Sequence, residues 1–229
     1  MDGAVDNLQE PRLPPVERVH LPIITAVPSS RHDKTMGSFL ELCESCGINN
    51  ILISHLQDLF QFSLALEYAL ERDEALFHPR AFDEDTISIQ RALLADPGVE
   101  APIERAFRIS ALIYMKTIMK EYPHLTTTSR ILVQQLKVSL KEIDEDSVLV
   151  PLHLWLFFMG GVVSQGTSER AWFVANLVRM TGAASMLNWE VIKAVLRMVL
   201  WVDNIHDRIC RTLWDEVEMT RTVLNGQLP

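Results

Sequence analysis

The segment PLHLWLFFMGGVV, residues 151–163, is apolar at almost every position. Proline fits the first turn of a helix, where its missing N–H leaves no hydrogen bond unmade, so Pro151 is a natural helix start. A helix that is apolar on every side has to be buried on every side. We therefore predict that this segment is the central helix of the fold. Its unbroken apolar run, Leu154 to Val163, is far shorter than the roughly 20 residues that a membrane span needs.

Two adjacent glycines, Gly160 and Gly161, lie inside this helix, although each lowers helix stability by about 0.5–1 kcal/mol relative to alanine. We expect a neighbouring backbone to approach closely at this point. The stretch GGVVSQG, residues 160–166, follows a helix rather than a strand and lacks GK[ST], so a phosphate-binding loop is not indicated. No G-x-S-x-G pattern around a nucleophilic serine occurs either.

From Ser38 onward the apolar residues recur with the period of amphipathic helices. Capping and breaking residues then set the boundaries. The predicted helices are Phe39–Cys46 with Gly47 as a left-handed cap, Asn50–Ala75, Asp85–Leu94, 107–122, one capped within 126–129 that carries Leu132 to Ile143, Pro151–Val163, Glu169–Met180, Trp189–Trp201, and one from Asp203 or Asn204 to Gly226. The pattern predicts an all-α protein, a helical bundle or α-solenoid-like array of about eight or nine helices.

The first residues have a different composition. Five of the 11 prolines fall within the first 28 positions, at Pro11, Pro14, Pro15, Pro22 and Pro28. Polar and charged residues are mixed in without a helical period. We predict an extended or disordered tail over residues 1–36 and one all-helical domain over residues 37–229.

The charge of the chain bears on its partners. The net charge is −9 and the pI about 5.2, whereas proteins that grip DNA through its phosphates carry an excess of lysine and arginine. Direct DNA contact is therefore not expected. The three cysteines are too few, and odd in number, for a disulfide framework, which favours a reducing compartment. The start of the chain has no apolar run or basic leader, so we expect no signal peptide.

Two groups have the residue types of a reactive or metal-binding site. Cys43-Glu-Ser-Cys46 has the spacing of a zinc or redox pair, but a zinc site needs four ligands and a redox motif needs a strand–helix–strand context. His153 lies within the apolar run and has the chemistry of a ligand or a general base. We favour buried structural cysteines, and a core or boundary histidine held by a hydrogen bond.

Acidic clusters at 83–85 and 144–146 suggest magnesium binding of the kind found in helical isoprenoid-processing enzymes. Such motifs need carboxylates that face each other from helix interiors. We predict instead that both clusters lie at helix ends, the first after a break at Pro79, where acidic side chains favour a helix N-terminus. A third acidic group, Asp203, Asp207 and Glu216, is a weaker candidate for magnesium binding of the same kind. No catalytic residue and no metal ligand is predicted, and no cofactor-binding residue is assigned.

Five tryptophans lie in the C-terminal third, at Trp155, Trp172, Trp189, Trp201 and Trp214. Core packing between helices is the favoured interpretation, and an apolar effector pocket or a dimer surface is the alternative. Three arginines in the same region, Arg170, Arg179 and Arg197, are interpreted as solvated or ion-paired, with one of them buried in its ion pair.

The order of motifs in this region resembles a known family. The ordered set is Pro151 with Trp155, the pair Gly160-Gly161, Gly166 before Arg170-Ala-Trp172-Phe173, then Trp189-Glu190, Leu200-Trp201 and Leu213-Trp214. It is similar to the C-terminal part of the regulatory domain of fungal zinc binuclear cluster transcription factors. The resemblance covers about residues 100–220 and is weaker from 38 to 100.

In such proteins an N-terminal module of six cysteines and two zinc ions reads DNA, and the helical region behind it is regulatory. The present sequence has three cysteines, so the zinc cluster is missing and no cofactor is expected in it. The chain would be a truncated gene model, or a regulator-like protein that has lost its DNA reader. Either way, the resemblance implies a non-enzymatic regulatory domain for RNA polymerase II transcription.

The resemblance also implies a nuclear location, with a cytosolic one otherwise. Protein partners or self-association, or a small-molecule effector, would act on the domain, and no membrane is involved. Two alternatives remain open: a stand-alone helical protein-interaction scaffold, and an isoprenoid-type helical enzyme that magnesium would stabilise.

Overall fold

The computed structural model describes residues 29–72, 79–95, 98–119, 127–144 and 148–226. Within these ranges the chain forms nine helices and no strand, which confirms the all-α prediction. The helices are α2 (Ser29–Ser45), α3 (Asn50–Arg72), α4 (Pro79–Leu94), α5 (Pro102–Ile118), α6 (Thr127–Glu142), α7 (Val150–Val163), α8 (Arg170–Ala183), α9 (Trp189–Leu196) and α10 (Asp203–Leu224).

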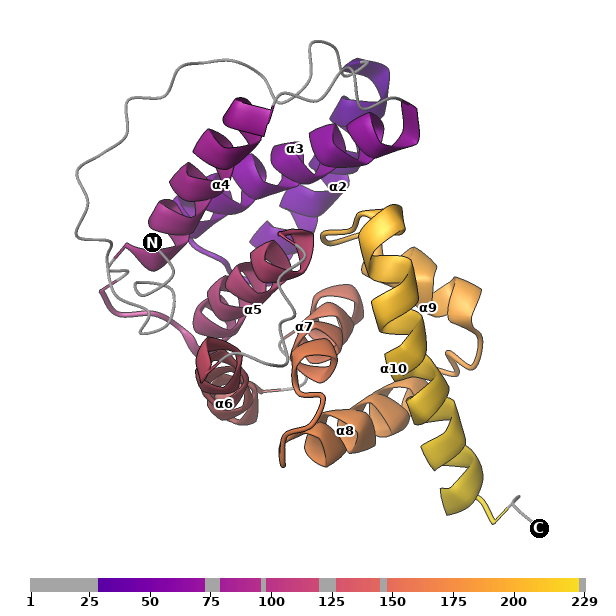
Figure 1. Cartoon of the computed structure of the whole chain (residues 1–229). Coiled ribbons are helices and arrows are strands. Elements are labelled where there is room, and N and C mark those ends of the chain that lie inside the picture. The colour runs from indigo at the N-terminus through magenta and orange to yellow at the C-terminus, as the bar shows by residue number, and fades with distance from the viewer. Residues whose placement is uncertain (1–28, 73–78, 96–97, 120–126, 145–147, 227–229) are drawn as a thin grey trace.

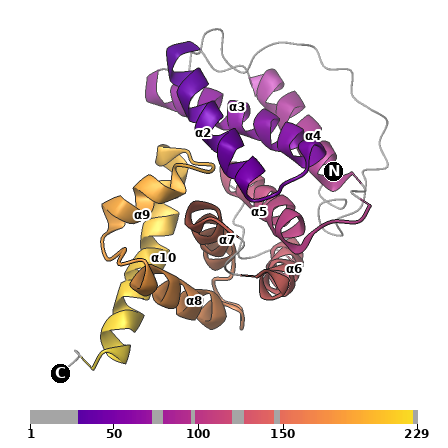
Figure 2. The same cartoon turned by 180° about the vertical axis from the view of Figure 1, so that it is seen from behind.

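Helix α7 lies in the middle of the molecule and contacts α5, α6, α8, α9 and α10 (Figure 1). All of its residues from Leu152 to Val163 are buried, as predicted for a helix without a polar face. Helix α5 is a second core helix, because it is buried continuously from Ala106 to Ile118. The view from behind shows α2, α3 and α4 gathered at one end of the molecule and α8, α9 and α10 at the other (Figure 2).

The first described helix begins earlier than the sequence predicted. We expected a short helix from Phe39, after a tail ending at residue 36, but α2 begins at Ser29. The rest of the predicted tail, residues 1–28, lies outside the described residues. The predicted cap is confirmed, because Gly47 has a φ of 69° and its N–H donates to the Glu44 carbonyl at 2.9 Å.

The helix predicted to start near Asp85 begins earlier in the structure, at Pro79. Pro79 is the first residue of α4, where the fixed φ of proline suits a helix start. The cluster Asp83–Asp85 therefore lies inside the helix rather than at its N-terminus. Arg80 Nε donates to Glu84 Oε1 at 2.8 Å, one turn further on, so part of this acidic charge is balanced within α4.

Helix α9 is shorter than predicted, ending at Leu196 instead of Trp201. The four consecutive apolar residues Val199 to Val202, which follow the exposed Met198, are all buried. Four consecutive residues of a helix point in all directions, and the outer side of α9 faces solvent, with Val191 47% exposed. The chain buries all four by leaving the helix, and the extended φ of −136° at Val202 leads into α10.

The glycine pair of α7 allows close packing, as expected, but against side chains and not against backbone. A methyl group on Gly160 would lie 2.2 Å from a ring carbon of Phe173 on α8 and 2.9 Å from Leu136 on α6. On Gly161 it would lie 2.5 Å from Leu213 of α10. The two glycines therefore let α6, α8 and α10 pack directly against the central helix.

Among the described helices, none combines the length and the apolar character that crossing a membrane would require.

Candidate functional site

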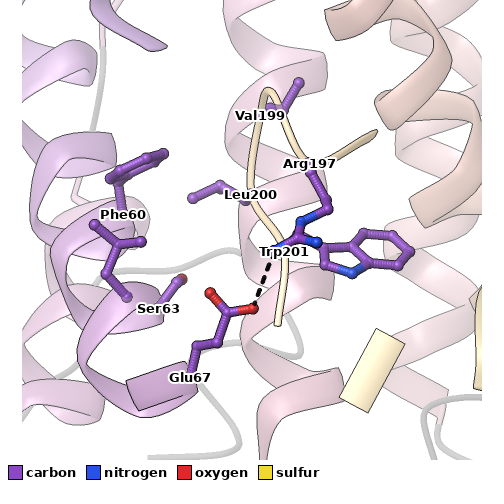
Figure 3. Close-up of a pocket in the computed structure, with 8 residues that line it drawn as sticks. Phe60, Ser63, Glu67, Arg197, Val199, Leu200 and Trp201 are labelled. Atoms are coloured by element: carbon purple, nitrogen blue, oxygen red, sulfur yellow. Dashed lines mark ion pairs between the residues drawn. The ribbon is translucent and has the colours of Figure 1, made fainter. Parts of the chain in front are cut away.

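A pocket of about 100 Å³ lies between α3 and the connection from α9 to α10 (Figure 3). One wall consists of Phe60, Ser63, Leu64 and Glu67, which have the i, i+3, i+4, i+7 spacing of a single helix face. The other wall is the connection itself, through Arg197, Val199, Leu200 and Trp201. The early end of α9 thus creates this wall, because a continued helix would carry the same side chains in different directions.

Glu67 is the charged group of the α3 wall, and only 9% of the residue is exposed. Its Oε1 atom lies 3.7 Å from Nη2 of Arg197, too far for a hydrogen bond, and has no hydrogen-bond partner (Figure 3). Burial raises the pKa of the Glu67 carboxyl; the positive charge of Arg197 opposes this rise, and the negative charge of Asp203 adds to it.

Behind the α3 wall lies a buried chain of polar groups. The Tyr114 hydroxyl donates to Ser63 Oγ at 3.0 Å, and Ser63 Oγ donates to the Leu59 carbonyl at 2.7 Å. Burial raises the pKa of Tyr114, so this phenol stays protonated. Its ring stacks on the imidazole of His206, with centroids 4.7 Å apart and planes 6° from parallel.

His206 joins the start of α10 to this chain of polar groups. Its Nδ1 accepts from the Val202 N–H at 3.0 Å, which satisfies the backbone at the helix N-cap. The Nε2–H donates to Thr117 Oγ1 at 2.9 Å, and Thr117 Oγ1 donates to the Tyr114 carbonyl at 2.7 Å. The histidine is fully buried, and burial lowers its pKa to about 4.

This pKa predicts that the protein loses stability in mild acid. A histidine with a lowered folded pKa binds fewer protons in the folded state than in the unfolded one. Lowering the pH from the ordinary histidine pKa near 6.5 to about 4 therefore stabilises the unfolded state relative to the folded state. We expect His206 to cost about 2 kcal/mol of unfolding free energy between pH 7 and pH 5, measured by urea denaturation. A His206→Gln variant should show a smaller loss over the same interval, and an equal loss would contradict the assignment.

The cysteines and His153 are buried, as the sequence indicated. Cys43, Cys46 and Cys210 are all free thiols, and burial raises the pKa of Cys43 to about 12, which makes it a poor nucleophile. His153 is 6% exposed and its ring packs against Phe157, with centroids 5.1 Å apart. In the part of the chain that the structure describes, no three histidine, cysteine or acidic side chains form a group that could hold a metal ion.

The acidic residues of α10 do not converge on one point. Lys193 Nζ lies 2.6 Å from Asp207 Oδ2 and 3.4 Å from Asp203 Oδ2, next to the pocket. Glu216 instead pairs with Arg170, whose Nε and Nη2 donate to its Oε2 at 2.9 and 2.6 Å. Asp144 is exposed, and residues 145 and 146 of the second predicted cluster lie outside the described residues.

The three arginines named from the sequence differ in their surroundings. Arg170 is ion-paired, as predicted, but the pair is only partly buried, since the Arg170 side chain is 16% exposed and that of Glu216 is 43% exposed. Arg170 also donates to the Gly161 carbonyl. Arg179 is exposed and donates to Asn176 at 3.3 Å. Arg197 is 43% exposed at the pocket, within 3.4 Å of Asp203.

The tryptophans are mainly core residues. Trp155 and Trp214 have no exposed surface, Trp189 and Trp201 are buried, and Trp172 is half-buried against Phe157 and Phe173. Of the five, Trp201 lines the pocket. Glu67 was not among the residues predicted from the sequence, although one signal pointed to it. Glu67 follows Phe60 by seven residues, so it is a charged residue on a helix face that is otherwise mainly apolar.

Comparisons with known proteins add one match. Residues 28–224 match a family model described as the fungal specific transcription factor domain. No curated protein and no solved structure matches the chain.

Proposed function

Because the chain belongs to the family of fungal specific transcription factor domains, we propose that it is a regulatory domain that controls transcription by RNA polymerase II through a separate DNA reader. The match over residues 28–224 carries this proposal and supports a role in transcription regulation. The family is one of transcription factor domains and not a class of enzymes. A nuclear location follows from the same role.

The composition supports the separation of this domain from DNA reading. A net charge of −9 opposes contact with phosphates, and three buried cysteines cannot supply the six thiolates of a binuclear zinc module. In this proposal, DNA is therefore read by another segment or by a partner. Mapping the 5′ end of the transcript that encodes the chain would show whether a six-cysteine module is joined to it upstream.

The proposed mechanism is a shift between conformations. The pocket lies where α3, at one end of the molecule, meets the start of α10, at the other. A ligand or protein partner that prefers one arrangement of these helices would increase its population, by no more than its difference in affinity. Apolar side chains on the last turns of α10, such as Met219 at 66% exposed and Leu224 at 70%, offer contact surface for a partner or for a second copy.

The proposal predicts a transcriptional effect when the chain is brought to DNA. We expect the full chain, fused to an unrelated DNA-binding module in yeast, to change expression of a reporter several-fold relative to the module alone. The Trp155→Ala variant, whose core is disrupted, should return expression to the level of the module. Reporter output equal to that of the module, at matched protein levels and in several growth media, would contradict a regulatory function.

The reporter and a measurement of magnesium-dependent unfolding separate the alternatives. A stand-alone interaction scaffold would bind partners without changing the reporter. An isoprenoid-type enzyme would be stabilised by magnesium, and Asp83→Ala or Asp144→Ala would remove that stabilisation. A magnesium-independent unfolding midpoint would exclude the enzyme.

A further inference from the structure

Glu67 has an acceptor that no group of the described chain satisfies. Its Oε1 is buried and without a hydrogen bond, and the nearest cationic atom, Nη2 of Arg197, lies 3.7 Å away. The carboxylate accepts a hydrogen bond from the backbone of Asp203, which leaves Oε1 as its unsatisfied atom. A buried oxygen without a donor costs stability, so native structures usually pair such an atom with protein, water or a ligand. The carboxylate points across the pocket toward Arg197 and the connection after α9 (Figure 3).

The charges around the pocket leave an excess of acid. Three carboxylates, those of Glu67, Asp203 and Asp207, face two cations, Lys193 and Arg197, at 2.6 to 3.7 Å. Oδ1 of Asp203 and Oδ1 of Asp207 are also buried without a hydrogen-bond partner. Of these five charged residues, Glu67 and Arg197 line the pocket, and the Nε1–H of Trp201 on its wall is also buried without a partner. The unsatisfied carboxylate oxygens lack N–H donors, and the surplus of carboxylates in this network favours a cation over an anion beside Glu67.

Apart from Ser63 and the indole N–H of Trp201, the remaining walls are apolar and limit the size of a ligand. Phe60, Val199 and Leu200 are all at least nine-tenths buried, and the Leu200 side chain points toward α3. The pocket measures about 100 Å³. Because one water molecule needs roughly 10–15 Å³ on this measure, it has room for a compound of about seven non-hydrogen atoms.

We propose that this pocket binds a small aliphatic primary ammonium compound, whose charged nitrogen donates to Glu67 and whose carbon chain packs on Phe60, Leu64 and Leu200. The ammonium group would supply the N–H donor that Oε1 of Glu67 lacks, because Arg197 stays 3.7 Å away. It would also connect α3 to the start of α10, because Glu67 and Asp203 belong to these two helices. If the regulatory function proposed above is correct, this compound is the effector of the domain. The role as effector rests on that function, whereas binding of the compound to the pocket does not.

A binding experiment on the purified full chain tests the proposal directly. The probe is n-butylammonium chloride at pH 7, compared with 1-butanol and sodium butyrate, which have similar size with no charge or the opposite charge. We expect n-butylammonium to raise the midpoint of thermal unfolding to a saturating value. The alcohol and the carboxylate should give no saturable rise at matched ionic strength.

Two variants locate the site. Glu67→Gln keeps the shape of the side chain and removes its charge, and should weaken n-butylammonium binding by about tenfold or more, as expected for a lost charged hydrogen bond. Glu41→Gln, at an exposed position of α2 outside the pocket, is the matched control and should bind as the wild type does. Circular dichroism shows whether each variant is folded, and the comparison of amine with alcohol needs no variant.

Any of three results would overturn the proposal: no saturable rise with n-butylammonium, an equal rise with 1-butanol, or unchanged binding by Glu67→Gln. These outcomes are independent of transcription. An inactive reporter together with amine binding would refute the regulatory function and leave the site, whereas an active reporter without amine binding would refute the site alone.

Discussion

Replacement of Trp155 by alanine should lower the free energy of unfolding by about 4 kcal/mol, within the range measured for large aromatic residues in cores. Trp155 has no exposed surface, and its ring packs edge-on against Phe107 at 5.6 Å and near Tyr114 at 5.9 Å. Its Nε1 donates to the Leu200 carbonyl at 2.8 Å. The variant therefore leaves a cavity beside both core helices and a buried carbonyl without its donor.

Urea denaturation followed by circular dichroism measures this loss. Trp155→Phe is the informative control, because it keeps most of the apolar volume but removes the N–H. We expect a smaller loss, of about 1–3 kcal/mol, from the unpaired Leu200 carbonyl and the lost volume. Since Leu200 lines the pocket, this variant should also weaken n-butylammonium binding. A loss below 1 kcal/mol for the alanine variant would show that Trp155 is not a core residue.

The second large effect is expected at Gly160. A single methyl group there would overlap Phe173, with no exposed surface, at 2.2 Å and Leu136 at 2.9 Å. The Phe173 ring cannot move freely, because it packs between Phe157 and Trp172. We expect Gly160→Ala to destabilise the protein by about 3 kcal/mol, at the upper end of the usual cost of overpacking.

Gly37→Ala is the matched control for this substitution. Gly37 lies within α2, and a methyl group on it would meet nothing within 4 Å. The same change should therefore stabilise the protein, by about 0.5–1 kcal/mol from helix propensity alone. Opposite signs for the two variants in thermal unfolding would confirm that packing around α7 excludes any side chain at Gly160. A neutral or stabilising Gly160→Ala would contradict it.

Elements defined by local chemistry were predictable from the sequence. The buried helix α7 follows from its composition, the end of α2 at Gly47 from the need for a positive φ, and the course of α10 from its apolar period. The N-cap of α10 is Val202, and not Asp203 or Asn204 as their side chains suggested. Errors arose where a local signal has two meanings or where tertiary packing overrides it. The start of α4 was predicted too late because proline, interpreted as a break, also begins helices. Helix α9 was predicted too long because the fold buries Val199 to Val202 by leaving the helix.

The candidate site was less predictable than the fold. Its two walls are more than 100 residues apart in sequence, so no local spacing joins Glu67 to Arg197. The tryptophans and the acidic clusters were the conspicuous site candidates in the sequence. In the structure most of the tryptophans pack in the core, and the described acidic residues do not form a common site. A charged residue on a buried helix face, such as Glu67, is a weaker signal, and it gains meaning only when its partners are known.

The burial of α7 also affects how the chain is synthesised. Leu213, which covers Gly161, follows it by 52 residues, so the most apolar segment emerges from the ribosome well before α10 exists. At about 5–20 residues per second, that segment stays uncovered for several seconds. Early termination between α7 and α10 should therefore yield products that aggregate or are held by chaperones. Cellular quality control would thus make production of this domain nearly all-or-none.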